Sequence, residues 1–224
     1  MPINAKYQAS FEAEFIYHIT ARTNNKELLF RTDENRIFFL NKFQKYISPF
    51  AETLVWTLLP NHVHFVIQIK SVQAITQYLQ ALTYDERTKV QEQFLDATDK
   101  KLEIEKLIER QFNSLFTSYT KAFNTFFNRE GNLFNSPFRR CIVDTALHLT
   151  RLIVYVHANV LKHKIHNHFQ TYKWSSYQAV ISNQSTNIQR AFVLDWFGGK
   201  EAFMKTHIEQ VEYYYAHELA DDDE

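Results

Sequence analysis

The apolar positions in the first third of the chain repeat with two different periods, which separates strands from helices. Residues 62–70 alternate between apolar and polar side chains, which predicts a half-buried strand. The stretches 15–20 and 53–59 are rich in β-branched and aromatic residues and predict two further strands. Between these two stretches, apolar residues at helical spacing follow Asp33, which we expect to cap a helix.

The second part of the chain is mainly helical in period. A short helix is predicted over about 72–82, and a long one over about 106–128. Residues 83–107 between them are dense in charge and sparse in apolar positions, which indicates an inserted, largely exposed helical excursion. A strand is expected within 133–143, and a further helix over about 147–161.

This order predicts an α+β fold. The sequence β-α-β-β-α-β, with an insert, is the plan of a ferredoxin-like split βαβ core, in which the sheet is antiparallel. We expect residues 1–160 to form the core domain, with the helical insert at about 83–107. Residues 161–224 are then a helical C-terminal extension that ends in an acidic tail.

Composition narrows the class of protein. Gly is only 3 of 224 residues, which disfavours glycine-rich phosphate loops and flexible linkers, whereas aromatic residues reach 16%. The single cysteine, Cys141, excludes an internal disulfide and a cysteine-rich zinc site. No apolar stretch approaches the roughly 20 residues that cross a membrane. We therefore expect a soluble cytoplasmic protein with no membrane partner.

The charges cancel in the sum but not along the chain. Lys and Arg number 25, as do Asp and Glu, so the formal net charge is zero. Residues 108–173 nevertheless carry 9 basic and 3 acidic side chains, and residues 195–224 carry 2 basic and 9 acidic ones. The basic segment is either an ordinary solvated surface or a face that binds a polyanion, and charge alone leaves both open.

His62 and His64 are the most informative pair of residues. Because side chains alternate along a strand, both imidazoles lie on one face, opposite the apolar face that must pack in the core. Two imidazoles in one place suit a divalent cation. The spacing alone also fits two structural histidines.

Tyr119 belongs to a stripe of aromatic and aliphatic residues on the long helix. Helical spacing joins it to Phe112, Leu115, Phe116, Phe123 and Phe126. Periodicity therefore predicts that Tyr119 is a packing residue.

One segment of the sequence resembles a known family. Residues 59–66 read Leu-Pro-Asn-His-Val-His-Phe-Val, which resembles the Met-Pro-Asn-His-Val-His segment of single-tyrosine HUH transposases, especially the REP-associated tyrosine transposases. Further segments resemble that family in the same order, over about residues 15–180. They are residues 17–22, 119–124, 131–140, 155–160 and 174–177.

The resemblance implies a transposase that nicks and rejoins single-stranded DNA, often next to a hairpin. In the family a magnesium or manganese ion sits on the two histidines, here His62 and His64. The nucleophile would be Tyr119, which would form a 5′-phosphotyrosine and release a free 3′-OH. The third metal ligand of the family lies about one turn beyond the tyrosine. Here that position is Phe123, which cannot ligate, so Asn124 is the nearest candidate.

The resemblance also suggests which side chains contact DNA. The candidates are Arg139, Arg140, Lys121, Arg129 and His18. A monomer and a homodimer both fit the family. Two other functions remain open at this point: a non-catalytic nucleic-acid-binding protein on the same fold, and a metal-dependent hydrolase that uses water as its nucleophile.

Overall fold

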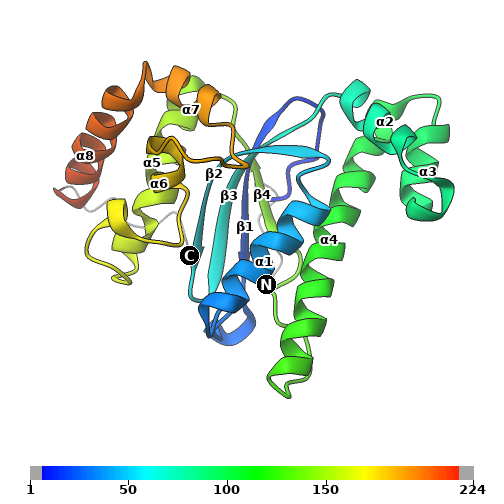
Figure 1. Cartoon of the computed structure of the whole chain (residues 1–224), viewed down its shortest axis with the longest axis horizontal. Coiled ribbons are helices and arrows are strands. Elements are labelled where there is room, and N and C mark those ends of the chain that lie inside the picture. Colours follow the sequence, from blue (N-terminus) through cyan, green and yellow to red (C-terminus); the bar gives the residue numbers. More distant parts are fainter. Residues whose placement is uncertain (1–6, 217–224) are drawn as a thin grey trace.

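A four-stranded antiparallel sheet lies at the centre of the computed structural model, which describes residues 7–216 (Figure 1). The strands are β1 (Ile16–Arg22), β2 (Ala51–Leu59), β3 (His62–Ile69) and β4 (Arg139–Ile142), in the spatial order β2-β3-β1-β4. This order, with helices between β1 and β2 and between β3 and β4, confirms the predicted α+β class and its ferredoxin-like plan.

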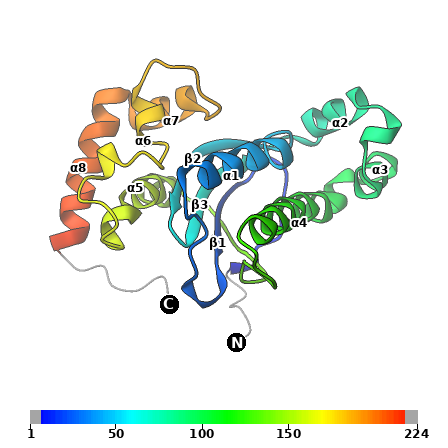
Figure 2. The same ribbon diagram turned by 60° about the horizontal axis from the view of Figure 1, so that its bottom comes forward.

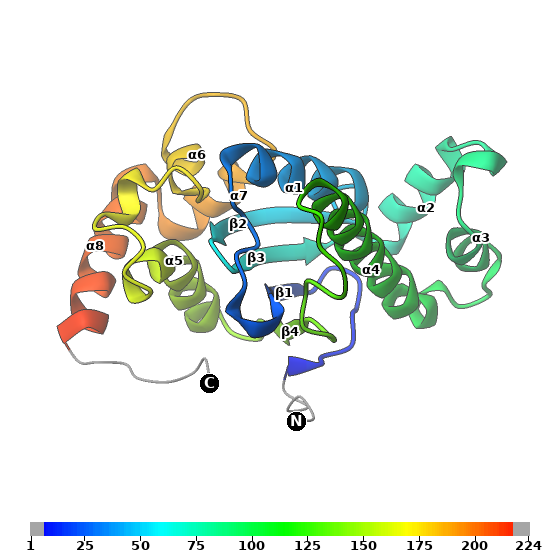
Figure 3. The same ribbon diagram turned by 90° about the horizontal axis from the view of Figure 1, so that it is seen from below.

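Helices α1 (Asp33–Tyr46) and α4 (Lys100–Phe126) pack on one face of the sheet (Figure 3). The apolar face predicted for β3 lies under them: the Phe65 ring stacks on Phe43 of α1, with centroids 4.0 Å apart. The prediction of a half-buried β3 is wrong, because its second face is covered as well. Both His62 and His64 are buried there.

The sequence indicated Asp33 as the N-terminal cap of α1, and this prediction is wrong. The cap is Thr32. Thr32 has an extended backbone, and its side chain accepts a hydrogen bond from the backbone N–H of Asn35. Asp33 is already helical, and its carboxylate instead accepts hydrogen bonds from Lys173 and Trp174. It therefore ties a distant segment to the start of α1.

The charged insert, residues 83–107, forms a helical unit with the helix before it at one end of the molecule. Helices α2 (Val72–Ala81) and α3 (Lys89–Asp96) lie beside the N-terminal part of α4 and project away from the sheet (Figure 1). The insert is less exposed than predicted, because Phe94 and Ile104 are fully buried between these helices. Together these residues extend the core that lies under α1 and α4.

The second face of the sheet is covered by α5 (Ala146–Lys162), which packs mainly on β2 and β3. The C-terminal helices α6 (Tyr177–Ile181), α7 (Arg190–Phe197) and α8 (Lys200–Ala216) lie beyond it (Figure 2). None of the helices in residues 7–216 is both long and apolar enough to cross a membrane. The predicted acidic tail, residues 221–224, lies outside the described residues.

A buried chain of hydrogen bonds joins α8 to the sheet through α5. His207 Nδ1 donates to the Phe203 carbonyl, so its Nε2 accepts from His157 Nδ1, 2.9 Å away. His157 Nε2 then accepts from the Ser176 hydroxyl, whose oxygen accepts the backbone N–H of Trp56 in β2. With both rings neutral, every nitrogen of the two rings has a hydrogen-bond partner.

Burial lowers the pKa of His207 to about 4 from the ordinary value of 6.5. As the pH falls from about 6.5 toward 4, the unfolded chain gains a proton that the folded chain does not bind. The free energy of unfolding should therefore fall, by on the order of 2 kcal/mol between about pH 7 and about pH 5 from this residue. Above about pH 7, His207 does not alter the pH dependence of the free energy of unfolding.

We expect His207→Gln to lower the free energy of unfolding at pH 7 but to give a flatter decline toward pH 5 than the wild type. Denaturant unfolding at both pH values measures this decline, with His166→Gln at an exposed position as the matched control. An unchanged decline in His207→Gln would show that His207 is not the buried neutral group described above.

Candidate metal and nucleic-acid site

A row of polar side chains lies on the face of the sheet that α5 covers. On β1 this face carries His18, Thr20 and Arg22, because Tyr17, Ile19 and Ala21 between them point into the apolar core. In the antiparallel register Thr20 lies opposite His64, and Arg22 lies opposite His62. The alternation predicted for β3 thus places both histidines beside the polar residues of β1.

His64 is held by a hydrogen bond to a second histidine. Its side chain is fully buried, and its Nδ1 lies 2.9 Å from His18 Nε2. The Thr20 hydroxyl is 3.3 Å from each of these two nitrogens. Burial, reinforced by the neighbouring His62, lowers the pKa of His64 well below its ordinary value. His64 is therefore a neutral imidazole with one N–H and one lone pair.

Helix α5 presents Tyr155, Asn159 and His163 to this row at four-residue intervals. The Tyr155 ring centroid lies 5.8 Å from that of His64 and 6.2 Å from that of His18. At the other end, the His163 ring lies 4.8 Å from His62. Asn159 lies one turn from each, so its side chain belongs to the same helix face, between these two contacts.

The polar atoms in this space are buried without the hydrogen bonds that burial normally requires. Asn159 is 1% exposed, and neither its Oδ1 nor its Nδ2 makes a hydrogen bond to any part of the chain that the structure describes. The same holds for His64 Nε2. Buried polar groups normally have a hydrogen-bond partner in folded proteins, so these atoms are candidates for binding a ligand.

Tyr119, the expected nucleophile, lies on the other face of the sheet. It is 1% exposed, and its hydroxyl donates to the Leu29 carbonyl at 2.8 Å. The rings of Phe30 and Phe39 surround it, with centroids 6.1 and 5.1 Å away. Burial raises the pKa of its phenol. The structure does not bring Tyr119 to the two histidines, and the aromatic stripe on α4 predicted this packing role.

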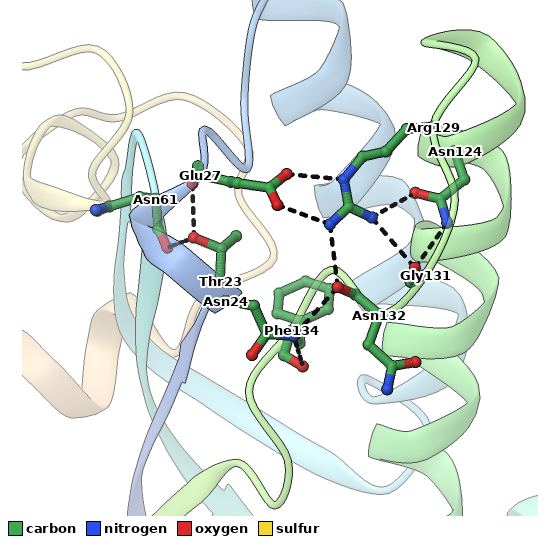
Figure 4. A network of polar contacts seen from close by, with 9 residues as sticks. All are labelled: Thr23, Asn24, Glu27, Asn61, Asn124, Arg129, Gly131, Asn132 and Phe134. Atoms are coloured by element: carbon green, nitrogen blue, oxygen red, sulfur yellow. Dashed lines mark hydrogen bonds and ion pairs between the residues drawn. The ribbon is translucent and has the colours of Figure 1, made fainter.

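Asn124, the expected third metal ligand, is used in a different network (Figure 4). Its Nδ2 donates to the Gly131 carbonyl, and its Oδ1 accepts from Arg129. Arg129 in turn forms a bidentate ion pair with Glu27, with distances of 2.7 and 2.9 Å. Neither side chain is brought to the histidines, because α4 packs on the opposite face of the sheet.

The remaining basic candidates are Arg139, Arg140 and Lys121. Because side chains alternate along β4, Arg139 and Arg140 point to opposite faces of the sheet. Arg140 points into the core side, is 5% exposed, and forms ion pairs with Glu105 and Glu109 of α4. Arg139 points to the histidine side: it pairs in register with Thr20, and its guanidinium lies over the Tyr7 ring at 4.6 Å. Lys121 is exposed on the outer face of α4, beside a shallow hollow that includes Phe126.

Sequence reasoning missed Tyr155 and Asn159. The signal was present, since Tyr155 and Asn159 are polar positions one turn apart on a helix that is otherwise mainly apolar. Residues 7–216 contain no cluster of three or more His, Cys, Asp and Glu side chains suited to a metal. The buried side chains on this face are two imidazoles from β3 and one amide from α5.

Removing the Tyr119 hydroxyl should destabilise the fold. Tyr119→Phe leaves the buried Leu29 carbonyl without its donor, which we expect to lower the free energy of unfolding by about 1–2 kcal/mol. Tyr84→Phe, at a side chain that is 73% exposed, is the control and should change stability by less than about 0.5 kcal/mol. Equal stability of Tyr119→Phe and wild type in denaturant unfolding would contradict the buried hydrogen bond.

Comparison with known proteins finds a likeness among solved structures. No protein-family model matches the chain, and no curated protein matches it significantly. Among solved structures, that of a REP-associated tyrosine transposase bound to a REP hairpin is similar over 78% of this chain and 83% of that chain. The sequence identity is 13% and the TM-score is 0.48. A likeness of this size does not identify the activity of the chain.

Proposed function

We propose that the protein is a metal-dependent enzyme that nicks and rejoins single-stranded DNA, with Tyr155 as its nucleophile. One observation carries this proposal: Tyr155 is the tyrosine whose ring contacts both His64 and His18, whereas Tyr119 is enclosed on the opposite face. Tyr155 is also partly exposed, as a group that must reach a DNA strand has to be.

The donors on β3 and α5 suit a divalent cation, and manganese accepts such imidazole nitrogens more readily than magnesium, which prefers oxygen ligands. His62, His64 and Asn159 would hold it, through imidazole nitrogens and an amide oxygen. The unsatisfied atoms of His64 and Asn159 support this set, because a cation would supply the partner that each buried lone pair lacks. When bound, such an ion would polarise the phosphoryl oxygens and stabilise the charge that develops on them.

In the proposed step, the Tyr155 oxygen attacks a phosphorus atom of the DNA backbone. A tyrosine–phosphate bond forms and the bond to the 3′ oxygen breaks, so the phenolic proton is lost and the departing oxygen becomes a 3′-OH. A second 3′-OH can reverse the step and join strands. Lys162, whose Nζ lies 5.6 Å from the centre of the Tyr155 ring, places positive charge beside this exchange.

Arg139 is the basic residue best placed to hold the DNA strand. It lies in the same cross-strand row as Thr20 and His64, roughly 10 Å from His64 by the usual strand spacing. Its guanidinium is partly exposed, whereas that of Arg140 is buried in ion pairs. A phosphate contact at Arg139 would position the strand without reading its sequence.

The covalent step can be tested by trapping. Wild-type protein is incubated with hairpin-bearing single-stranded DNA and Mn²⁺, and SDS-stable complexes are separated on a gel. We expect Tyr155→Phe to lose the complex and Tyr119→Phe, compared at equal folded concentration, to retain it. EDTA present during the incubation should prevent formation of the complex in both the wild type and Tyr119→Phe.

The other outcomes separate the alternative functions. Loss of the complex in Tyr119→Phe and retention in Tyr155→Phe would overturn the choice of nucleophile. Cleavage by both variants and wild type without a trapped complex would favour a hydrolase that uses water. Binding of the DNA by wild type with neither cleavage nor trapping would favour a non-catalytic nucleic-acid-binding protein.

A further inference from the structure

We propose that His18 and Asn61 are positioning residues that set the tautomers of His64 and His62, so that each neutral ring carries its proton on Nδ1 and its lone pair on Nε2. The inference rests on the proposed function for its purpose, but its geometry is independent of it. Both histidines make a hydrogen bond through Nδ1, which leaves Nε2 as the nitrogen that would bind the cation.

For His64, only one of the two neutral tautomers gives its ring proton an acceptor. A neutral imidazole carries a single N–H, on either Nδ1 or Nε2. If the proton were on Nε2, it would be a buried donor with no acceptor among the described residues. With the proton on Nδ1, His64 donates to His18 Nε2 at 2.9 Å, and only a lone pair is left at Nε2.

To accept that bond, His18 must be neutral and carry its own proton on Nδ1. It stands on β1 next to β3, and the Thr20 hydroxyl lies 3.3 Å from its Nε2. The two imidazoles are nearly parallel, with ring planes at 19° and centroids 5.1 Å apart. His18, which the sequence suggested as a DNA contact, is therefore placed to support His64.

For His62 the partner is the residue before it. The Asn61 side-chain oxygen lies 2.7 Å from His62 Nδ1, and an amide oxygen can only accept. The proton of His62 is thus placed on Nδ1, which leaves the lone pair on Nε2. This is the arrangement by which metal-binding histidines are usually oriented in proteins.

Asn61 is itself held by the network in which Asn124 and Arg129 take part (Figure 4). The Asn61 carbonyl accepts hydrogen bonds from both the backbone N–H and the hydroxyl of Thr23. The same hydroxyl contacts the Glu27 carbonyl at 2.6 Å, and the Glu27 carboxylate pairs with Arg129. The turn that carries Asn61 is therefore anchored to the end of α4.

The tautomers can be read directly by NMR of the histidine rings in metal-free protein labelled with ¹⁵N. In the wild type we expect the proton on Nδ1 of both His62 and His64. His18→Ala should shift His64 to a mixture of tautomers, and Asn61→Ala should do the same for His62. His18→Gln and Asn61→Asp, which retain an acceptor oxygen, should restore the Nδ1 proton. His166→Ala is the matched control and should change neither ring.

A titration with Mn²⁺ alone connects the tautomers to binding. Each alanine variant should bind Mn²⁺ about 10–100-fold more weakly than wild type, with recovery in the Gln and Asp variants. Wild-type tautomers in the alanine variants, or Mn²⁺ affinities within about twofold of wild type, would overturn the positioning role. Wild-type Mn²⁺ binding that does not depend on His62 and His64 would instead overturn the proposed metal site, whatever the tautomers.

Discussion

The docking of α5 on the sheet is the contact on which the candidate site depends. The Thr57 hydroxyl of β2 donates to the Val156 carbonyl of α5 at 2.7 Å, and His157, Ser176 and Trp56 add a second polar connection beside it. These bonds add to an apolar contact, because Val55, Leu59 and Val66 of the sheet share one buried cluster with the apolar residues of α5. Because α5 closes over β3, two imidazoles and an amide become buried together.

Burial of these groups dictates their chemistry. A buried imidazole is neutral, and a neutral imidazole must place its single proton where an acceptor exists. His18 on β1 and Asn61 in the turn before β3 provide those acceptors. The polar atoms that remain then face Asn159 and Tyr155. The same helix that removes water thus supplies the residues that could act on a substrate.

Much of the fold follows from the periodicity of the sequence. The alternation in β3 correctly predicts that Phe65 lies in the core and that His62 and His64 share the opposite face. It cannot predict that this opposite face is buried, because α5 comes from a segment some eighty residues later. The helix cap was displaced by one residue, since Thr32 and Asp33 are both good capping residues and only the backbone decides between them.

The site was harder to predict than the fold. Tyr119 and Tyr155 both lie on helices next to the sheet, and no local pattern states which face a helix will cover. Arg139 and Arg140 are adjacent in sequence, yet Arg140 turns toward the carboxylates of Glu105 and Glu109, which the charged insert and α4 bring to that face. The direction of each side chain depends on tertiary contacts between residues that are more than thirty positions apart in the sequence.

The central claim is that chemistry occurs on the α5 face of the sheet and not in the aromatic core. Tandem mass spectrometry of wild-type protein trapped on single-stranded DNA tests it most directly, because the modified peptide identifies the tyrosine without any substitution. We expect a nucleotide on Tyr155, in the peptide from α5. A nucleotide on Tyr119, in the peptide from α4, would contradict it.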